Sequence, residues 1–202
     1  MQHPINKSVV CLILAAGQSH RFGSSKLRHR LSPSGEPMIV HTIRCYQAVF
    51  DKPAVVIAGH DDDLREIVIQ TGARVIDNPA AEEGMSQSIV QGVSQTSNSA
   101  GWLIALGDMP WVAESTVRQL LAKAQPELIV VPSYQQRDGN PVLFGAQYAS
   151  QLVALSGDQG AKSILQAADS RVIRIATEDQ GVLHDVDTPA DLVNQVERRN
   201  TR

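Results

Sequence analysis

The sequence predicts an α/β protein with a mostly parallel central sheet. Short runs rich in Val, Ile and Leu alternate with longer amphipathic segments, which is the rhythm of strands joined by helices. The apolar runs are nearly continuous, as is typical of parallel strands covered on both faces. Two of them lead into the loops LAAGQSHRFG and LGDMP, at the position where open α/β sheets bind ligands.

The individual elements follow from local patterns along the chain. Apolar runs predict strands at residues 9–14, 54–57, 74–76, 102–106 and 128–131, and the segments between them predict helices at 37–50, 61–71, 85–94 and 113–124. Pro37 suits the first turn of a helix, and Asp61, Asp62 and Asp63 are favourable near a helix N-terminus. Further strands are expected at 141–144 and 172–175, with helices at 162–168 and 189–198. No internal repeat or break in composition marks a second domain.

The composition narrows the class of protein. The chain has 202 residues, of which 43% are hydrophobic and 19% charged, as in an ordinary soluble globular protein. It has no apolar run long enough to cross a membrane and no signal-peptide pattern at its N-terminus, so we expect a cytoplasmic protein. A net charge of −3 without a basic stripe argues against a nucleic-acid partner.

The segment LILAAGQSHRFGSSK, residues 12–26, predicts a nucleoside triphosphate site. Gly17 and Gly23 allow the backbone to approach phosphates, Ser19 adds a hydroxyl, and Arg21 and Lys26 can neutralise the charge. The spacing matches neither G-x-x-x-x-G-K-[ST] nor G-x-G-x-x-G, so a P-loop and a dinucleotide fingerprint are both excluded. The competing interpretation is an ordinary strand-to-helix connection.

Acidic residues after predicted strands are candidate metal ligands. Asp108 follows the run WLIAL, and Mg²⁺ often needs only one or two carboxylates together with phosphates and water. Asp108 could instead cap the turn at Met109 and Pro110. Asp185 and Asp187 are the candidates for a second carboxylate, although Asp187 could equally cap the helix expected after it.

Two further segments carry candidate binding residues. Asn78, Gly84, Met85, Ser86 and Ser88 lie between a strand and a helix, where a nucleobase or ribose could meet hydroxyl and backbone groups, although Ser86 could be an ordinary helix cap. The small-residue run GDQGAK at 157–162 could approach a phosphate of the second substrate, or only begin a helix.

Residues 12–26 resemble the L-x-L-A-A-G-x-S-x-R-[MF]-G-x-x-K signature of nucleotidyltransferases that build the molybdenum cofactor. The resemblance is to the molybdenum cofactor cytidylyltransferase branch of the MobA-like superfamily. Further matches follow in the expected order, namely NPAAEEGMSQSI, GDMP, RDGNPVLF, GDQGAKSIL and DVDTPADL. Six matching strings in sequence make a chance resemblance improbable.

The resemblance implies a Rossmann-like, three-layer α/β/α nucleotidyltransferase fold and a single domain over residues 1–202. Residues 8–125 or so would bind the nucleotide and residues 126–190 the acceptor. The implied reaction is Mg²⁺-dependent transfer of a nucleotidyl group from CTP to a molybdopterin-type cofactor, which gives molybdopterin cytosine dinucleotide and pyrophosphate. A client molybdoenzyme or its chaperone is a possible protein partner.

The resemblance also assigns roles to residues. It implies catalytic roles for Lys26, Arg21 and Asp108, and metal binding by Asp108 and Asp187. Asn140 stands where many relatives carry His. The nucleotide-binding set is Leu14, Ala15, Ala16, Gly17, Ser19, Arg21, Gly23, Lys26, Asn78, Ser88, Gly107 and Asp108, and the acceptor-binding set is Asn140, Pro141, Gly157, Asp158, Gly160 and Lys162.

Three alternatives remain open at the level of sequence. The guanylyltransferase branch typically reads L-A-G-G where this chain has Leu14, Ala15, Ala16 and Gly17, so Ala16 favours cytidine. Another acceptor, such as a sugar phosphate, would keep the same chemistry. A non-catalytic protein that delivers the molybdenum cofactor is the third alternative, against which the presence of both Lys26 and Asp108 argues.

Overall fold

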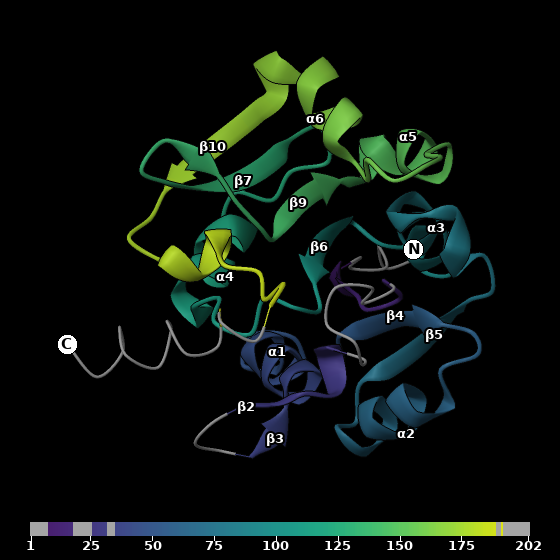
Figure 1. Ribbon diagram of the computed structural model, residues 1–202. Helices are drawn as coiled ribbons and strands as arrows, with labels where there is room; N and C mark the ends of the chain where they lie inside the picture. The colour runs from purple at the N-terminus through teal and green to yellow at the C-terminus, as the bar shows by residue number, and fades with distance from the viewer. Residues whose placement is uncertain (1–7, 18–25, 32–34, 189–190, 192–202) are drawn as a thin grey trace, which may run out of the picture.

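The computed structural model describes residues 8–17, 26–31, 35–188 and 191. Its centre is an eight-stranded sheet in the order β10-β7-β9-β6-β1-β4-β5, with β8 paired to β7 (Figure 1). Pairing is parallel except where β9 runs antiparallel to both β6 and β7, and where β8 pairs with β7. The strands are β1 (Val9–Leu14), β4 (Ala54–Ala58), β5 (Arg74–Asn78), β6 (Gly101–Leu106), β7 (Ile129–Tyr134), β8 (Arg137–Asp138), β9 (Val142–Gly145) and β10 (Val172–Ala176).

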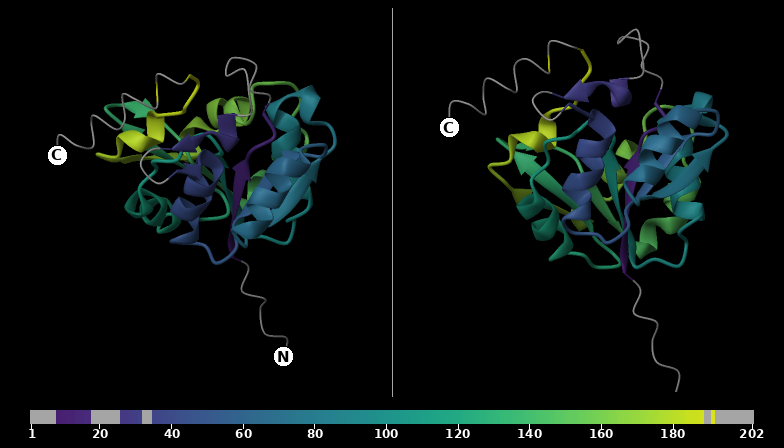
Figure 2. Two further views of the ribbon diagram at one scale, coloured as in Figure 1. Left: turned by 60° about the horizontal axis from the view of Figure 1, so that its bottom comes forward. Right: turned by 90° about the horizontal axis from the view of Figure 1, so that it is seen from below.

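Helices cover both faces of this sheet, because successive strand residues point to opposite sides. On β1, Cys11 and Ile13 join one buried cluster, and Leu12 and Leu14 join the other. The first cluster includes residues from α1 (Met38–Gln47), α2 (Asp62–Gln70) and α4 (Glu114–Leu121). The second includes residues from α3 (Met85–Ser94), α5 (Ala149–Val153) and α6 (Lys162–Ala167). Figure 2 shows β1, in purple, in the middle of the molecule with helices on either side. The predicted three-layer α/β/α fold is therefore confirmed.

Helix starts test the local predictions. The Asp61 carboxylate accepts a hydrogen bond from the Leu64 N–H at 3.1 Å, and Asp62 and Asp63 lie in the first turn of α2, as expected. Pro37 was expected inside the first turn of α1 but is its N-cap residue, in extended backbone that ends the short strand β3 (Glu36–Pro37). The Ser86 hydroxyl donates to the Ser156 carbonyl at 3.2 Å and does not cap α3, whose N-cap residue is Gly84.

The described chain also contains elements that no pattern indicated. Strand β2 (Arg30–Leu31) pairs with β3 in a separate two-stranded sheet, and α5 and β8 are five and two residues long. Such short elements lack a full period of apolar residues. The helix predicted at 189–198 falls almost entirely outside the described residues. In the part of the chain that the structure covers, no helix has the length and apolar character needed to cross a membrane.

Candidate functional site

The site begins where β1 and β6 end side by side. Leu14 is paired with Leu106 in the parallel register, and the Gly107 N–H donates to the Leu14 carbonyl at 2.8 Å. A Cβ on Gly107 would come within 3.0 Å of that carbonyl oxygen, so glycine permits the close approach. The Thr42 hydroxyl of α1 donates to the Gly107 carbonyl at 2.8 Å and so holds the turn that follows β6 against α1. The loop after β1 and the carboxylate of Asp108 are thereby brought to one edge of the sheet.

Lys26 joins this edge to the C-terminal part of the chain. Its Nζ lies 2.7 Å from Oδ2 of Asp108 and 2.9 Å from Oδ1 of Asp187. Asp187 is positioned next to Asp108 because the Val186 N–H donates to the Asp108 carbonyl at 3.0 Å. Lys26 and Asp187 are separated by 161 residues of sequence, so the fold assembles a contact that no local pattern specifies.

The electrostatics of this cluster favour a charged lysine beside a negative surface. Partial burial of Lys26 by itself would lower its pKa, but the hydrogen bonds and charges of Asp108 and Asp187 outweigh burial and raise the pKa. The pKa of the nearby Asp185 carboxyl is raised, first by burial and then by the charges of Asp187 and Asp108. Three carboxylates thus influence one another, and Lys26 offsets their repulsion.

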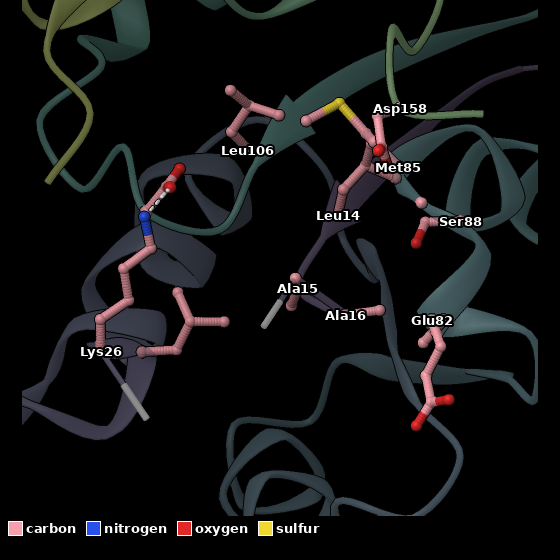
Figure 3. Close-up of a pocket in the computed structure, with 14 residues that line it drawn as sticks. Leu14, Ala15, Ala16, Lys26, Glu82, Met85, Ser88, Leu106 and Asp158 are labelled. Carbon is pink, nitrogen blue, oxygen red and sulfur yellow. Dashed lines mark ion pairs between the residues drawn. The ribbon is translucent and has the colours of Figure 1, made fainter. Parts of the chain in front are cut away.

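A cavity of about 390 Å³ opens beside this cluster. Leu14, Ala15, Ala16 and Gly17 line it from the end of β1, and Lys26 and Asp108 line it from one side. Figure 3 shows Lys26 on one side of the cavity, with Ser88 and Glu82 on the opposite side. A side chain added at Gly17 would meet no described atom within 4 Å, so protein packing does not require glycine there.

The wall formed by α3 depends on two local arrangements, one at Asn78 and one at Gly84. Asn78 is fully buried, and its amide donates to the Ser88 hydroxyl at 3.1 Å while its carbonyl oxygen accepts from the Ala80 N–H at 3.0 Å. Asn78 therefore positions Ser88 and does not itself line the cavity. At Gly84 the backbone has a φ of +108°, and a Cβ would overlap with Asp158 and with the Gly157 carbonyl. Only glycine allows the 157–158 segment to close this wall.

A second cavity of about 660 Å³ adjoins the first. The two cavities share the apolar lining residues Leu14, Met85 and Leu106, so they adjoin at these side chains. The second cavity has an apolar floor and a polar rim. Its floor contains Ile89, Ile104, Val131, Val142, Phe144 and Leu165, and its rim contains Asp138, Asn140, Gln159, Lys162, Gln166 and Arg174.

The structure distributes the predicted residues over these features. The first cavity is lined by Leu14, Ala15, Ala16, Gly17, Lys26, Ser88 and Asp108, and also by Asp158, which was predicted for the acceptor. The second is lined by Asn140, Gly160 and Lys162. Neither cavity is lined by Asn78, Gly107, Pro141 or Gly157, and Asp187 reaches the site through Lys26. Ser19, Arg21 and Gly23 lie outside the described residues.

Sequence reasoning missed several lining residues. Glu82, Leu27 and Ala81 line the first cavity, and the Arg174 guanidinium at the rim of the second donates to the Asp138 carboxylate at 3.0 Å. The apolar floor also went unnoticed, because its residues read simply as strand and helix core. A usable signal for Arg174 was its charge inside the apolar run VIRIA.

The donor set suits a divalent cation that also contacts phosphate. Among the described residues, no group of three or more His, Cys, Asp or Glu side chains forms a metal cage. Mg²⁺, however, is usually held by one or two carboxylates plus substrate phosphates and water. Asp108 and Asp187 present two carboxylate oxygens to one point, which Lys26 Nζ marks at 2.7 and 2.9 Å. These two residues fit such an ion.

Comparison with known proteins decides the family. The model of the MobA-like NTP transferase domain matches residues 11–172. The chain belongs to this family. The match runs from within β1 to the start of β10, and it includes every residue that lines the two cavities except Arg174. Together with the fold, it makes the chain a nucleotidyltransferase domain of the MobA-like superfamily.

Individual relatives of this MobA-like domain are distant. The chain is 29% identical over 191 residues to the bifunctional protein GlmU of Paracoccus denitrificans (strain Pd 1222). The aligned region covers 88% of this chain but only 38% of the length of GlmU. Rv0371c from Mycobacterium tuberculosis H37Rv, also solved in complex with manganese, is 26% identical with a TM-score of 0.78, covering 94% of this chain and 98% of that one. A nucleotidyl transferase from Methanothermobacter thermautotroptrophicus (Mth528) shares the fold with a TM-score of 0.82 at 20% identity, covering 98% and 100%.

Proposed function

We propose that this MobA-like protein transfers a cytidylyl group from CTP to the terminal phosphate of a molybdopterin-type cofactor and releases pyrophosphate. The observation that carries the proposal is the pair of adjoining cavities, with a cluster of cation and carboxylates at the edge of the first. Two substrates whose reacting phosphates meet where the cavities adjoin, beside Leu14, Met85 and Leu106, would need little further alignment.

In this proposal the first cavity takes the nucleotide. The triphosphate lies toward Lys26, whose ammonium stabilises the negative charge that grows as the bond to pyrophosphate breaks. Gly17 leaves room for phosphate oxygens next to the backbone. Ser19, Gly23 and Arg21 are proposed as further phosphate contacts on the strength of the signature alone. The acceptor phosphate is already an anion, so the attack on the α-phosphorus requires neither a protein nucleophile nor a general base.

Asp108 and Asp187 are proposed to hold Mg²⁺. The ion would neutralise phosphate charge and orient the triphosphate. The manganese complex of Rv0371c supports a role for a divalent cation in proteins of this kind. Asp187 follows the segment proposed to bind the acceptor, so through the metal ion it would connect that segment to the bound nucleotide.

The second cavity is proposed to take the acceptor. Its apolar floor, which includes the buried ring of Phe144, suits a broad ring system. Asn140 can bind a polar edge of that ring system. Lys162 at the rim supplies a positive charge for the acceptor's phosphate. Gly160 keeps the loop before α6 close to Met85, since a Cβ there would come within 3.0 Å of the Met85 sulfur.

The test measures pyrophosphate release with CTP, GTP, ATP and UTP, each with Mg²⁺ and with or without molybdenum cofactor. We expect release only when CTP and the cofactor are both present. Mass spectrometry should then detect the cytosine dinucleotide. Release with GTP alone among the nucleotides would reassign the base, whereas nucleotide binding without any release would favour a non-catalytic delivery protein. Asp108→Asn is the matched inactive control.

A further inference from the structure

Lys26 uses the same oxygen atoms that a metal ion would use. Its Nζ lies 2.7 Å from Oδ2 of Asp108 and 2.9 Å from Oδ1 of Asp187, and the exposed fraction of its side chain is 17%. An ammonium at these distances makes two charge-assisted hydrogen bonds. The two carboxylates come from segments far apart in sequence and are joined at this point by one cation that the chain itself supplies.

Lys26 and a magnesium ion cannot share this position. Mg²⁺ binds oxygen ligands at about 2.0–2.1 Å and demands nearly regular octahedral geometry. An ion placed between the two carboxylates would lie against the ammonium, and two cations in such contact repel strongly in a partly desolvated site. Metal binding therefore requires that the Lys26 side chain leave the carboxylates.

We propose that Lys26 is a built-in competitor of the metal ion, which occupies Asp108 and Asp187 until a bound triphosphate draws it away. This inference rests on the proposed function, because it takes these carboxylates as the metal ligands. The triphosphate offers Lys26 a stronger partner in the first cavity, which the side chain already lines. Binding of the nucleotide then releases the carboxylates, and metal affinity rises only when a substrate is present.

Thermodynamic linkage turns this competition into a measurable coupling. If the nucleotide raises the affinity for metal, the metal must raise the affinity for nucleotide by the same factor. A protein without the Lys26 ammonium should lose much of this coupling, because no lysine then competes with the metal for the two carboxylates before the nucleotide binds. Metal binding in the absence of nucleotide is therefore the decisive quantity.

The experiment titrates Mn²⁺ into the protein without nucleotide and follows free Mn²⁺ by electron paramagnetic resonance. Lys26→Met and Lys26→Gln remove the competing charge, Lys26→Arg keeps it, and Lys123→Met makes the same charge change after the C-terminal end of α4. We expect the two neutral variants at Lys26 to bind Mn²⁺ roughly tenfold more tightly than the unmodified protein, a typical size for coupling between sites. The Arg variant and Lys123→Met should behave like the unmodified protein.

Thermal unfolding supplies a second readout. Mn²⁺ should raise the unfolding temperature of the neutral Lys26 variants more than that of the unmodified protein, because at a given concentration a ligand that binds the folded state more tightly stabilises it more. Equal Mn²⁺ affinity in Lys26→Met, Lys26→Gln and the unmodified protein would overturn the inference. Equal tightening by Lys123→Met would also overturn it, since the effect would then come from net charge.

A final arm separates this inference from the proposed function. CTP with a methylene bridge between the α- and β-phosphorus atoms cannot release pyrophosphate, so it can be added with Mn²⁺. The unmodified protein should take up more Mn²⁺ than the analogue alone explains. If it does not, the metal assignment of the proposed function fails. If it does, and the neutral variants still show no gain without nucleotide, only the competition is wrong.

Discussion

At the scale of single residues, Asp108 offers the most direct test of the site. Its carboxylate bonds Lys26 and is only partly exposed, but it belongs to no buried apolar cluster. We expect Asp108→Asn to abolish nearly all Mg²⁺-dependent pyrophosphate release, because an amide is a poor ligand for a hard cation. The unfolding transition should shift little. Near-normal release by this variant would remove Asp108 from the metal site.

Lys26→Met should slow turnover strongly, even though the same change is expected to tighten metal binding. The loss of a compact cation beside the triphosphate removes stabilisation of the transition state, which a tighter metal cannot replace. Steady-state kinetics with varied CTP and varied acceptor will separate the effects. A change confined to the apparent affinity for the acceptor would mean that Lys26 contacts the acceptor and not the triphosphate.

Ala16 is the residue on which the choice of base depends. It lines the first cavity at the end of β1, and its methyl group should crowd a purine more than a pyrimidine. A difference of one methyl group is typically worth about 1–3 kcal/mol, so Ala16→Gly should relax the preference for CTP over GTP without reversing it. Competition between the two nucleotides measures the ratio. Equal use of both by the unmodified protein contradicts the cytidine assignment.

Residues near strand ends were predictable as a group, but their partners were not. A loop after one strand and an acid after another predict a shared edge, and Lys26 and Asp108 do meet there. The pattern could not decide whether Asp187 caps a helix or faces the site, because the answer depends on a contact across 161 residues. It also could not show that Asn78 is fully buried and acts on Ser88.

At the scale of elements, the pairing of β6 with β9 depends on two opposed glycines, Gly101 and Gly145. A Cβ on Gly145 would collide with the carbonyl oxygens of Gln125 and Pro126, which are backbone atoms and cannot rotate away. We expect Gly145→Ala to lower the free energy of unfolding by roughly 3 kcal/mol, the range of overpacking in a tight site.

Gly59→Ala is the matched control, because its Cβ would have ordinary contacts of 3.6 Å and more. Urea denaturation of both variants gives the comparison. If Gly145→Ala and Gly59→Ala unfold at the same urea concentration, the close backbone approach at β9 is not a constraint on the fold.

Long elements were readable from periodicity, whereas short ones were not. The ranges of β1 and α3 agree with the predicted ranges at both ends, because each begins and ends at a clear change in pattern. Helix α5 has five residues and β8 has two, too few to show a period. Their positions are set by packing and by pairing with β7, and these arise only in the folded chain.

At the scale of the whole molecule, the two cavities predict separable kinetic effects. Lys162 lies at the rim of the second cavity and does not line the first. We expect Lys162→Met to raise the KM for the acceptor roughly tenfold, the loss of one charge-assisted contact, with little change in the KM for CTP. Lys123→Met serves as the control for net charge. An equal rise in both KM values would contradict the division between the cavities.

The layered architecture was predictable because continuous apolar strands demand cover on both faces. The second cavity was not, since its floor is made of the same residue types as the core. Apolar residues such as Val131 and Phe144 serve both packing and binding, and a linear pattern cannot distinguish the two uses.

The division of the site into two cavities also bears on how such a domain can acquire new substrates. The second cavity, the proposed acceptor site, takes its polar rim from residues after β7, whereas the first is built mostly from earlier ones. If the proposed assignment holds, exchange of Asn140, Lys162 and Arg174 will redirect the chain to another acceptor while the nucleotide site stays unchanged. Directed evolution limited to these three positions would then yield new products.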